Sequence, residues 1–370
     1  MSLIAPYAKE HQDTNGPGDA RPTALRIIRD QSLDGRLRGK VMLVTGGTSG
    51  IGFETAEAEL RHDNKPGKLE YMQMSLDSPK SIREFAADFL SRTSGKLNIL
   101  VCNAGIRGYP KGTTEDGFEL HLGTNHLGHF ALFQALNDAL LTSSTPSFHS
   151  RVVCLSASGN RQSGIRFDDL NFDRHDEYQP LLAYAQSKTA NIYMAFEIEK
   201  RHGASGLHGL AAHPGGISGT RLNRMTPESE LKALTGDPLV AQRMKSAEQG
   251  AATTVWAAIS REWEGKGGVF LEDCQESELW RGDVTVLAPG HAAHIHDGES
   301  AARLWGKELY EPAFANTLQP ITGIIRVTSP FKILIADVAA DILDPALGGA
   351  IGALEAFERS EPAVERFLCA

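Results

Sequence analysis

Short apolar runs alternate with longer amphipathic stretches along most of this chain. The first run, at 40–45, reads Lys-Val-Met-Leu-Val-Thr and leads into glycines, which is typical of a parallel strand buried on both faces. Similar runs predict further strands, at 69–75, 97–102, 151–156, 206–213 and 268–271. The stretches between them predict helices, at 23–31, 51–62, 184–201 and 246–259. This alternation predicts an α/β fold with a doubly wound parallel sheet, which binds ligands at the carboxyl ends of its strands.

A glycine-rich turn follows the first predicted strand, and its glycines have the spacing G-x-x-x-G-x-G. Glycines permit a tight turn and let a pyrophosphate approach the backbone at the start of a helix. The free N–H groups and the dipole of that helix favour an anion. The turn therefore predicts a dinucleotide-binding site, formed by Thr45, Gly46, Ser49, Gly50, Ile51 and Gly52.

Tyr184 and Lys188 are four residues apart within a predicted helix, so both side chains lie on one face. A free tyrosine has a pKa of about 10 and is a poor acid or base near neutral pH. A lysine ammonium beside it favours the phenolate and lowers that pKa. Many surface helices contain this spacing, but downstream of a dinucleotide-type turn it indicates a general acid/base pair.

Together these motifs resemble those of the short-chain dehydrogenase/reductase family over 21–309. Several segments are similar to the retinol dehydrogenase and WW-domain oxidoreductase branch, in its fungal form. The landmarks occur in the family order, at 45–52, 102–105, 125–130, 184–188 and 213–216. The resemblance implies a Rossmann-type sheet and an NAD(P)-dependent oxidoreductase, in which a hydride moves between the nicotinamide and a carbonyl or alcohol carbon.

The same resemblance implies roles for individual residues. Tyr184 is the general acid/base, Lys188 lowers its pKa and holds the nicotinamide ribose, and Asn125 orders a water that relays protons. Further cofactor contacts are implied for Asp77, Asn103, Ala104, Gly105, Ile217 and Ser218. A purely structural role, at a strand end or on a helix surface, is the alternative for each polar residue.

The catalytic serine of the family is replaced in this chain. The segment 155–159 reads Leu-Ser-Ala-Ser-Gly, and an ungapped match puts Ala157 at the serine position. Ser156 and Ser158 flank it, but neighbours in an extended strand point to opposite faces. Ser158 lies where the strand ends, so we favour it as the catalytic substitute.

A second departure follows the glycine turn, where a whole strand–helix unit of the family is absent. The run at 69–75 and the following Asp77 are similar to the family's third strand and its adenine-contacting aspartate. The absent strand would carry the residue that separates NAD from NADP. The branch commonly uses NADP, which is therefore the expected cofactor. We expect 69–75 to pair directly beside the first strand through a right-handed crossover; the alternative is a chain that folds poorly.

Composition narrows the function classes. The chain has 370 residues, enough for one large α/β domain with extensions. Its net charge of −9 argues against a nucleic-acid partner. Its four cysteines show no paired spacing, which suggests reduced thiols, and we find neither a signal peptide nor a membrane span. We therefore expect a soluble cytoplasmic enzyme with a small-molecule carbonyl or alcohol substrate and no membrane partner; a homo-oligomer stays open.

Three regions are expected: a flexible N-terminal extension at 1–20, the oxidoreductase domain at 21–309, and a C-terminal extension of unknown role at 310–370. Within the last, 321–327 is compatible with a strand and 331–343 with an amphipathic helix. A histidine cluster is expected to be solvated or to flank a helix rather than to bind metal, at His291, His294 and His296.

The substrate is expected to be a hydrophobic or aromatic small molecule of specialised metabolism. The apolar residues of the loop at 218–242 would cap such a ligand. The alternative from another class is a catalytically weak nucleotide-binding or interaction protein, which keeps Tyr184 and Lys188 but lacks the serine.

Overall fold

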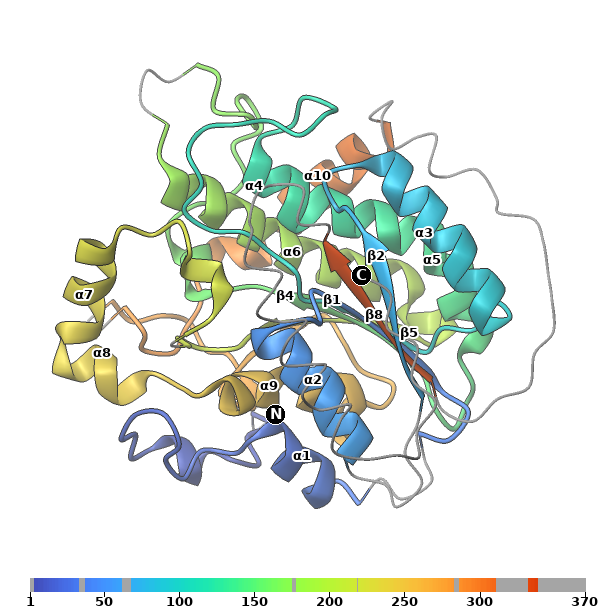
Figure 1. Cartoon of the computed structure of the whole chain (residues 1–370), viewed down its shortest axis with the longest axis horizontal. Coiled ribbons are helices and arrows are strands. Elements are labelled where there is room, and N and C mark those ends of the chain that lie inside the picture. The colour runs from blue at the N-terminus through green and yellow to red at the C-terminus, as the bar shows by residue number, and fades with distance from the viewer. Residues whose placement is uncertain are drawn as a thin grey trace, which may run out of the picture.

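A mostly parallel sheet runs through the middle of the computed structural model, which describes residues 3–32, 37–61, 68–174, 178–217, 219–282, 286–310 and 332–338 (Figure 1). Its strands in chain order are β1 (Val41–Thr45), β2 (Lys68–Met74), β3 (Ile99–Cys102), β4 (Ser150–Leu155), β5 (Leu207–His213), β6 (Val269–Glu272), β7 (Gln275–Glu276) and β8 (Lys332–Val338). Across the sheet the order is β2-β8-β1-β3-β4-β5-β6-β7. Neighbouring strands are parallel except β6 and β7, which form an antiparallel hairpin.

Helices cover both faces of this sheet (Figure 1). One layer consists of α1 (Ala24–Asp30), α2 (Gly50–Arg61) and α9 (Ala247–Ile259). The other consists of α3 (Pro79–Thr93), α5 (Gly128–Ser143), α6 (Pro180–His202) and α10 (Gly298–Tyr310). The remaining α-helices are short: α4 (Leu120–Leu122), α7 (Glu228–Gly236) and α8 (Pro238–Arg243). Helices on both faces of a parallel sheet confirm the predicted doubly wound α/β fold.

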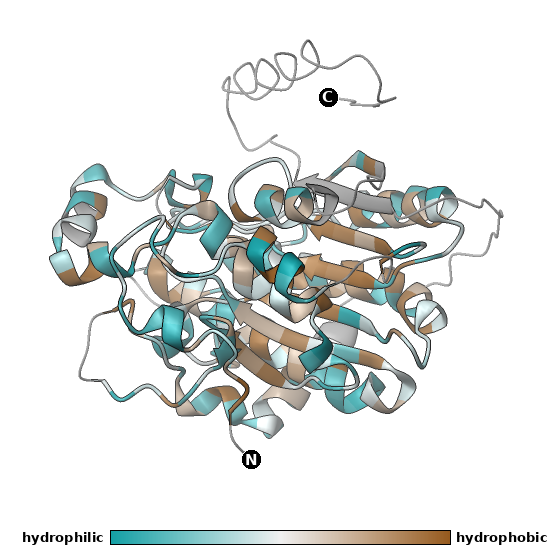
Figure 2. Ribbon diagram, turned by 90° about the horizontal axis from the view of Figure 1, so that it is seen from below, coloured by the Kyte–Doolittle hydropathy of each residue, from teal (hydrophilic) through white to brown (hydrophobic). Residues whose placement is uncertain are grey.

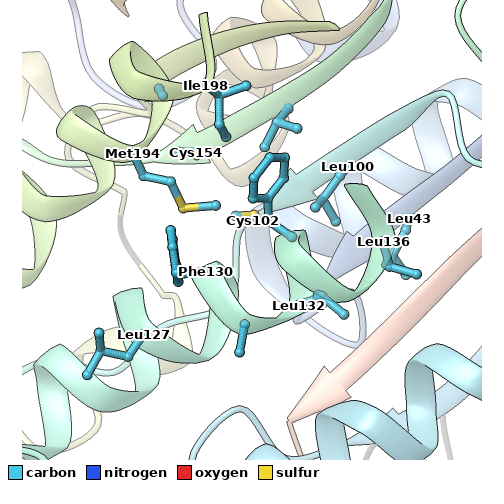
Figure 3. Close-up of a cluster of buried hydrophobic side chains, with 14 of the residues drawn as sticks. Leu43, Leu100, Cys102, Leu127, Phe130, Leu132, Leu136, Cys154, Met194 and Ile198 are labelled. Carbon is cyan, nitrogen blue, oxygen red and sulfur yellow. The ribbon is translucent and has the colours of Figure 1, made fainter. Parts of the chain in front are cut away.

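The two layers of helices bury alternate side chains of each strand. In β1, Val41 and Leu43 belong to one hydrophobic core, whereas Met42 and Val44 belong to the other. Figure 3 shows part of the first core, in which side chains from the sheet and from α5 and α6 meet: Leu43, Leu100, Cys102, Phe130, Leu136, Cys154, Met194 and Ile198. In Figure 2 these strands are hydrophobic ribbons enclosed by helices of mixed hydropathy. Each fully buried large apolar side chain contributes about 1.5–3 kcal/mol to folding.

The strands and helices expected between 23 and 271 are present, although α6 begins at Pro180, ahead of Tyr184. The run at 268–271 forms β6 but does not close the sheet, because β7 follows it and β8 enters elsewhere. The segment 331–343, expected to be a helix, contains β8 instead. Its Lys-Ile-Leu-Ile-Ala-Asp-Val run is short and apolar, and such runs suit a buried strand as well as a helix. The strand expected at 321–327 lies outside the described residues.

The expectation that β2 pairs beside β1 was wrong, because β8 lies between them (Figure 1). Val41 to Thr45 of β1 are in register with Lys332 to Ala336. Lys68 to Met74 of β2 are in register with Lys332 to Val338. The connection through α2 leaves a gap one strand wide, and a strand there satisfies the backbone groups of both neighbours at once. The C-terminal region thus fills the place of the strand that is absent after the glycine turn.

The N-terminal extension, expected to be flexible, makes specific contacts over 3–20. Tyr7 is buried, and the Gly16 N–H donates to the Gln242 carbonyl at 2.8 Å. Gln249 of α9 accepts from the Gly18 N–H at 2.9 Å and donates to the Asp19 carboxylate at 3.0 Å. These bonds attach the extension to the end of α8 and to the first turn of α9.

We expect removal of residues 311–370 to destabilise the protein, because it leaves β1 and β2 each with an unpaired edge inside the sheet. If the loss amounts to about 3 kcal/mol, the melting temperature falls by roughly 4–5 °C, because the entropy of unfolding of a chain of this length is about 0.65–0.8 kcal/mol/K. Thermal unfolding followed by circular dichroism measures this. A chain that ends after Val338 keeps every described residue and serves as the matched control, with a melting temperature close to that of the full chain.

Candidate active site

A glycine turn joins β1 to α2. Gly46 and Gly50 have φ angles of +67° and +57°, which side chains other than glycine rarely adopt. A Cβ on Gly52 would lie 2.3 Å from the carbonyl oxygen of Gly46, so a larger residue does not fit. The N-terminal end of α2 is therefore flanked by bare backbone, and its free N–H groups and dipole suit a phosphate.

Asn103, at the end of β3, fixes this turn. Its side-chain amide donates to the carbonyl oxygens of Thr45 at 2.8 Å and Gly46 at 3.3 Å. His129 Nδ1 donates to the Asn125 carbonyl at 2.8 Å, so its Nε2 accepts from the Thr45 hydroxyl at 2.8 Å. Burial lowers the pKa of His129 to about 3, which keeps the ring neutral in this arrangement.

Tyr184 and Lys188 are buried on one face of α6 and both line the same cleft. The Lys188 ammonium nitrogen lies 5.6 Å from the centre of the Tyr184 ring and donates to the Leu155 carbonyl at 3.2 Å. Burial raises the pKa of Tyr184 to about 12, and the charge of Arg107 opposes this rise. Burial lowers the pKa of Lys188 to about 8. The pair has the expected geometry, but in this structure burial outweighs the expected lowering of the Tyr184 pKa.

Asn125 lies in a π-helical turn, Gly123–Leu127, between α4 and α5. Single π-turns of this kind are frequent at functional sites. Its side chain accepts from the Ile106 N–H at 2.8 Å, and donates to the Ile106 carbonyl at 3.0 Å and the Ser187 hydroxyl at 2.9 Å. Asn125 thus connects the backbone just after Gly105 to α6, which is a structural role. Its part in a proton relay stays a prediction.

The segment after β4 carries the position of the missing serine. Ala157 has an extended backbone and lines the cleft. The Ser156 hydroxyl donates to the Lys188 carbonyl at 2.8 Å, so it holds α6 against β4 and is committed there. Ser158 also lines the cleft, and none of the described residues hydrogen-bonds its hydroxyl. Of the two flanking serines, only Ser158 is therefore free to act as a donor to a substrate.

The predicted site residues meet in one cleft of about 620 Å³ at the carboxyl ends of the parallel strands. This volume is within the usual range for small-molecule sites. The predicted residues that line it are Gly46, Ser49, Gly50, Ile51, Gly52, Asp77, Asn103, Ala104, Gly105, Ser158, Tyr184, Lys188 and Ile217. Thr45 and Asn125 lie behind its wall, and Ser218 lies outside the described residues.

The cleft also contains residues that sequence reasoning missed. Arg107 follows Gly105 by two residues, and its guanidinium carbon lies 5.9 Å from the centre of the Tyr184 ring. Arg161 lies over the Trp280 ring at 4.7 Å, and both line the cleft. No spacing motif marks these residues, because loops far apart in the sequence bring them together.

A buried ion pair supports the cleft wall at Ile217. Lys245 forms a backbone bridge with Ile217, and its ammonium pairs with the Asp273 carboxylate at 2.6 Å. Asp273 and Cys274 form the two-residue turn of the β6–β7 hairpin, and both have positive φ. Burial alone would raise the pKa of Asp273, but the Lys245 ammonium holds this pKa well below its usual range. The acidic turn residue thus stays charged and fixes the loop after β5.

In the described part of the chain, no group of three histidine, cysteine or acidic side chains could hold a metal ion. None of the helices in the same ranges combines the length and the apolar composition of a membrane span.

Comparison with known proteins gives several relatives, although no family model matches the chain. It is 43% identical over 326 residues to "Short-chain dehydrogenase/reductase prx1" of Penicillium roqueforti, covering 82% of this chain and 94% of the relative. It is 39% identical to "Oxidoreductase calI" of Penicillium decumbens over 333 residues, covering 82% and 96%. It is 33% identical to "Retinol dehydrogenase 12" of Mus musculus over 293 residues, covering 73% and 85%. A solved structure of an uncharacterised protein from Mycobacterium Paratuberculosis matches with a TM-score of 0.53 and 29% identity, covering 77% and 95%.

The matched regions cover nearly the whole length of the two fungal relatives, and the names of these relatives agree with the chemistry that the cleft offers. The fungal resemblance and the retinol dehydrogenase resemblance are both confirmed. This chain therefore belongs to the short-chain dehydrogenase/reductase family and is an NAD(P)-dependent oxidoreductase.

Proposed function

We propose that this protein interconverts the carbonyl and alcohol forms of a small hydrophobic or aromatic molecule of specialised metabolism. The observation that carries the proposal is the meeting of Tyr184 and Lys188 with the glycine turn in a single cleft. Apolar and aromatic side chains also line the cleft: Leu181, Leu222, Leu231, Trp280, Val286 and Leu287. Such a lining suits a hydrophobic substrate.

The residues present fit a dinucleotide. The backbone cradle at Gly46, Gly50 and Gly52 suits the pyrophosphate, and Asp77, for which the resemblance implies a contact with the adenine, lines the same cleft. A Cβ on Gly105 would lie 3.4 Å from the Lys188 ammonium, so this glycine keeps the space beside Lys188 clear. When bound, the nicotinamide supplies or accepts the hydride.

The protein's own part is to exchange a proton with the substrate oxygen. Because the pKa of Tyr184 is raised to about 12, its hydroxyl stays protonated at neutral pH. A protonated hydroxyl can donate to the oxygen of a carbonyl as that oxygen gains negative charge. The cationic groups Lys188 and Arg107 flank the same ring and stabilise the phenolate that remains.

For the cofactor we propose NADP, which the resemblance to the retinol dehydrogenase branch favours. In this family the discriminating residue lies on the strand beside the first one, and here β8 has that position. The part of the site that meets the adenosine ribose is therefore formed by the C-terminal region rather than by the segment after the glycine turn.

Fluorescence titration of the full chain with NADH and NADPH tests this choice. We expect NADPH to bind more tightly by about tenfold, a preference of about 1.4 kcal/mol. Equal binding of both cofactors, or tighter binding of NADH, would contradict the proposal.

Tyr184→Phe tests the reaction itself. Because only the hydroxyl is removed, we expect kcat to fall by about 10²–10⁴ while the cofactor dissociation constant stays within about twofold. Single-turnover oxidation of the reduced cofactor with a panel of aromatic ketones and aldehydes measures kcat, and fluorescence titration measures the dissociation constant. If the unchanged protein binds cofactor but turns over none of the panel, the binding-protein alternative is favoured.

The serine position allows a paired test. Ser158→Ala should lower kcat by about 10²–10³, because it removes a donor to the developing oxyanion. Ser156→Ala is the matched control: its hydroxyl bonds the Lys188 carbonyl, so we expect a lower melting temperature and little change in kcat. Ala157→Ser restores the family residue and should raise kcat. If Ser158→Ala leaves kcat unchanged, the hydrogen-bond donor to the oxyanion is another residue.

A further inference from the structure

The cleft is positively charged although the chain as a whole is acidic. The net charge is −9, yet the described residues that line the cleft include a single acidic residue, Asp77. The basic residues that line it are Arg107, Arg161, Lys188, Arg221 and Arg224. A cleft of this kind attracts anions.

Most of these cations already have a task within the protein. Arg161 donates to three backbone carbonyls, those of Ser158, Val286 and Ala288. Arg224 donates to the Tyr109 hydroxyl at 2.7 Å. Arg221 is exposed, at the start of the 3-10 turn Arg221–Asn223. These arginines therefore shape the walls of the cleft or are exposed to solvent.

Arg107 differs from them in both position and bonding. Its Nη1 donates to the Asn223 side-chain oxygen at 2.8 Å and the Thr226 hydroxyl at 3.3 Å, and both acceptors are neutral. Across the described ranges, its other two nitrogens have no hydrogen-bond partner and no carboxylate pairs with it. By contrast, Arg21, Arg26 and Arg151 each pair with a carboxylate.

The position of Arg107 is fixed relative to the reacting group. Its backbone follows Ile106, which Asn125 holds through two hydrogen bonds. Its guanidinium lies against the Tyr184 ring, and its Nη1 is held by the loop that caps the cleft. A rigid guanidinium with one edge unused can bind a carboxylate with two parallel hydrogen bonds.

We propose that the substrate carries a carboxylate near its reacting carbonyl, and that Arg107 binds this carboxylate. This inference rests on the proposed function and names the class of its substrate: a hydrophobic or aromatic oxo acid, or the matching hydroxy acid. The apolar walls hold the carbon skeleton, Tyr184 meets the oxygen, and Arg107 fixes the orientation of the molecule. A neutral ketone of the same shape leaves the guanidinium edge unpaired and binds less well.

Matched probes test this in a complex that cannot react. With the oxidised cofactor bound there is no hydride to transfer to a ketone, so calorimetry measures the binding of 4-acetylbenzoate and of its isosteric amide, 4-acetylbenzamide. We expect the unchanged protein to prefer the anion by about tenfold or more. Arg107→Met should bind the anion as weakly as the amide, and Arg107→Lys should restore part of the preference.

Lys111→Met is the control for net charge. Lys111 is on the same loop as Arg107, but it is half-exposed, does not line the cleft and pairs with Asp173 at 3.2 Å. This variant loses one positive charge and should keep the preference for the anion. If Lys111→Met loses the preference for the anion as fully as Arg107→Met does, the preference comes from the net charge of the protein, and the proposal is overturned.

Two further outcomes separate the proposals. If the unchanged protein binds cofactor but binds both probes equally, or neither, the carboxylate class is wrong and the oxidoreductase proposal stands. If the unchanged protein binds no cofactor, the proposed function fails, and this inference fails with it. The pH profile adds an independent readout: without Arg107 the pKa of Tyr184 rises further, so alcohol oxidation, which needs the phenolate, should move to higher pH.

Discussion

The backbone pairing of β1 on both of its edges is the constraint on which the rest of the structure depends. β1 leads directly into the glycine turn, so its position sets where a dinucleotide can lie. β3 pairs with one edge and delivers Asn103 to the turn, whereas β8 pairs with the other. A strand inside a parallel sheet cannot leave one row of N–H and C=O groups unpaired without a large cost. The absence of one strand after α2 is tolerated because another part of the chain supplies its backbone.

Burial sets the electrostatics of the cleft. It raises the pKa of Tyr184 and lowers the pKa of Lys188, so burial shifts both groups toward their neutral forms, although Lys188 stays mostly protonated at neutral pH. Nearby charges oppose the effect of burial, and Arg107 is the one that stabilises the Tyr184 phenolate. The Lys245–Asp273 pair lies behind the wall, where it fixes the loop at Ile217 without entering the cleft. This ion pair is thus separated from the titratable side chains that line the cleft.

Local patterns predicted most of the fold and most of the cleft. The apolar runs predicted the strands up to β6, and the Tyr184 to Lys188 spacing predicted two side chains that line the same cleft, because both signals lie within a few consecutive residues. β8 could not be predicted in this way, since its place depends on a strand edge formed much earlier in the sequence. Arg107 was missed for a related reason: its place in the cleft depends on contacts with Tyr184 and Asn223, which are distant in sequence. Non-local contacts of this kind leave no periodicity to detect.

The charges beside Tyr184 act on the step in which its hydroxyl would give up a proton. Burial raises the pKa of Tyr184, so the protein interior alone disfavours the phenolate. The charge of Arg107 opposes this rise, and the Lys188 ammonium lies over the same ring. The same two cations would therefore stabilise the phenolate formed when a carbonyl is reduced and keep it accessible when an alcohol is oxidised.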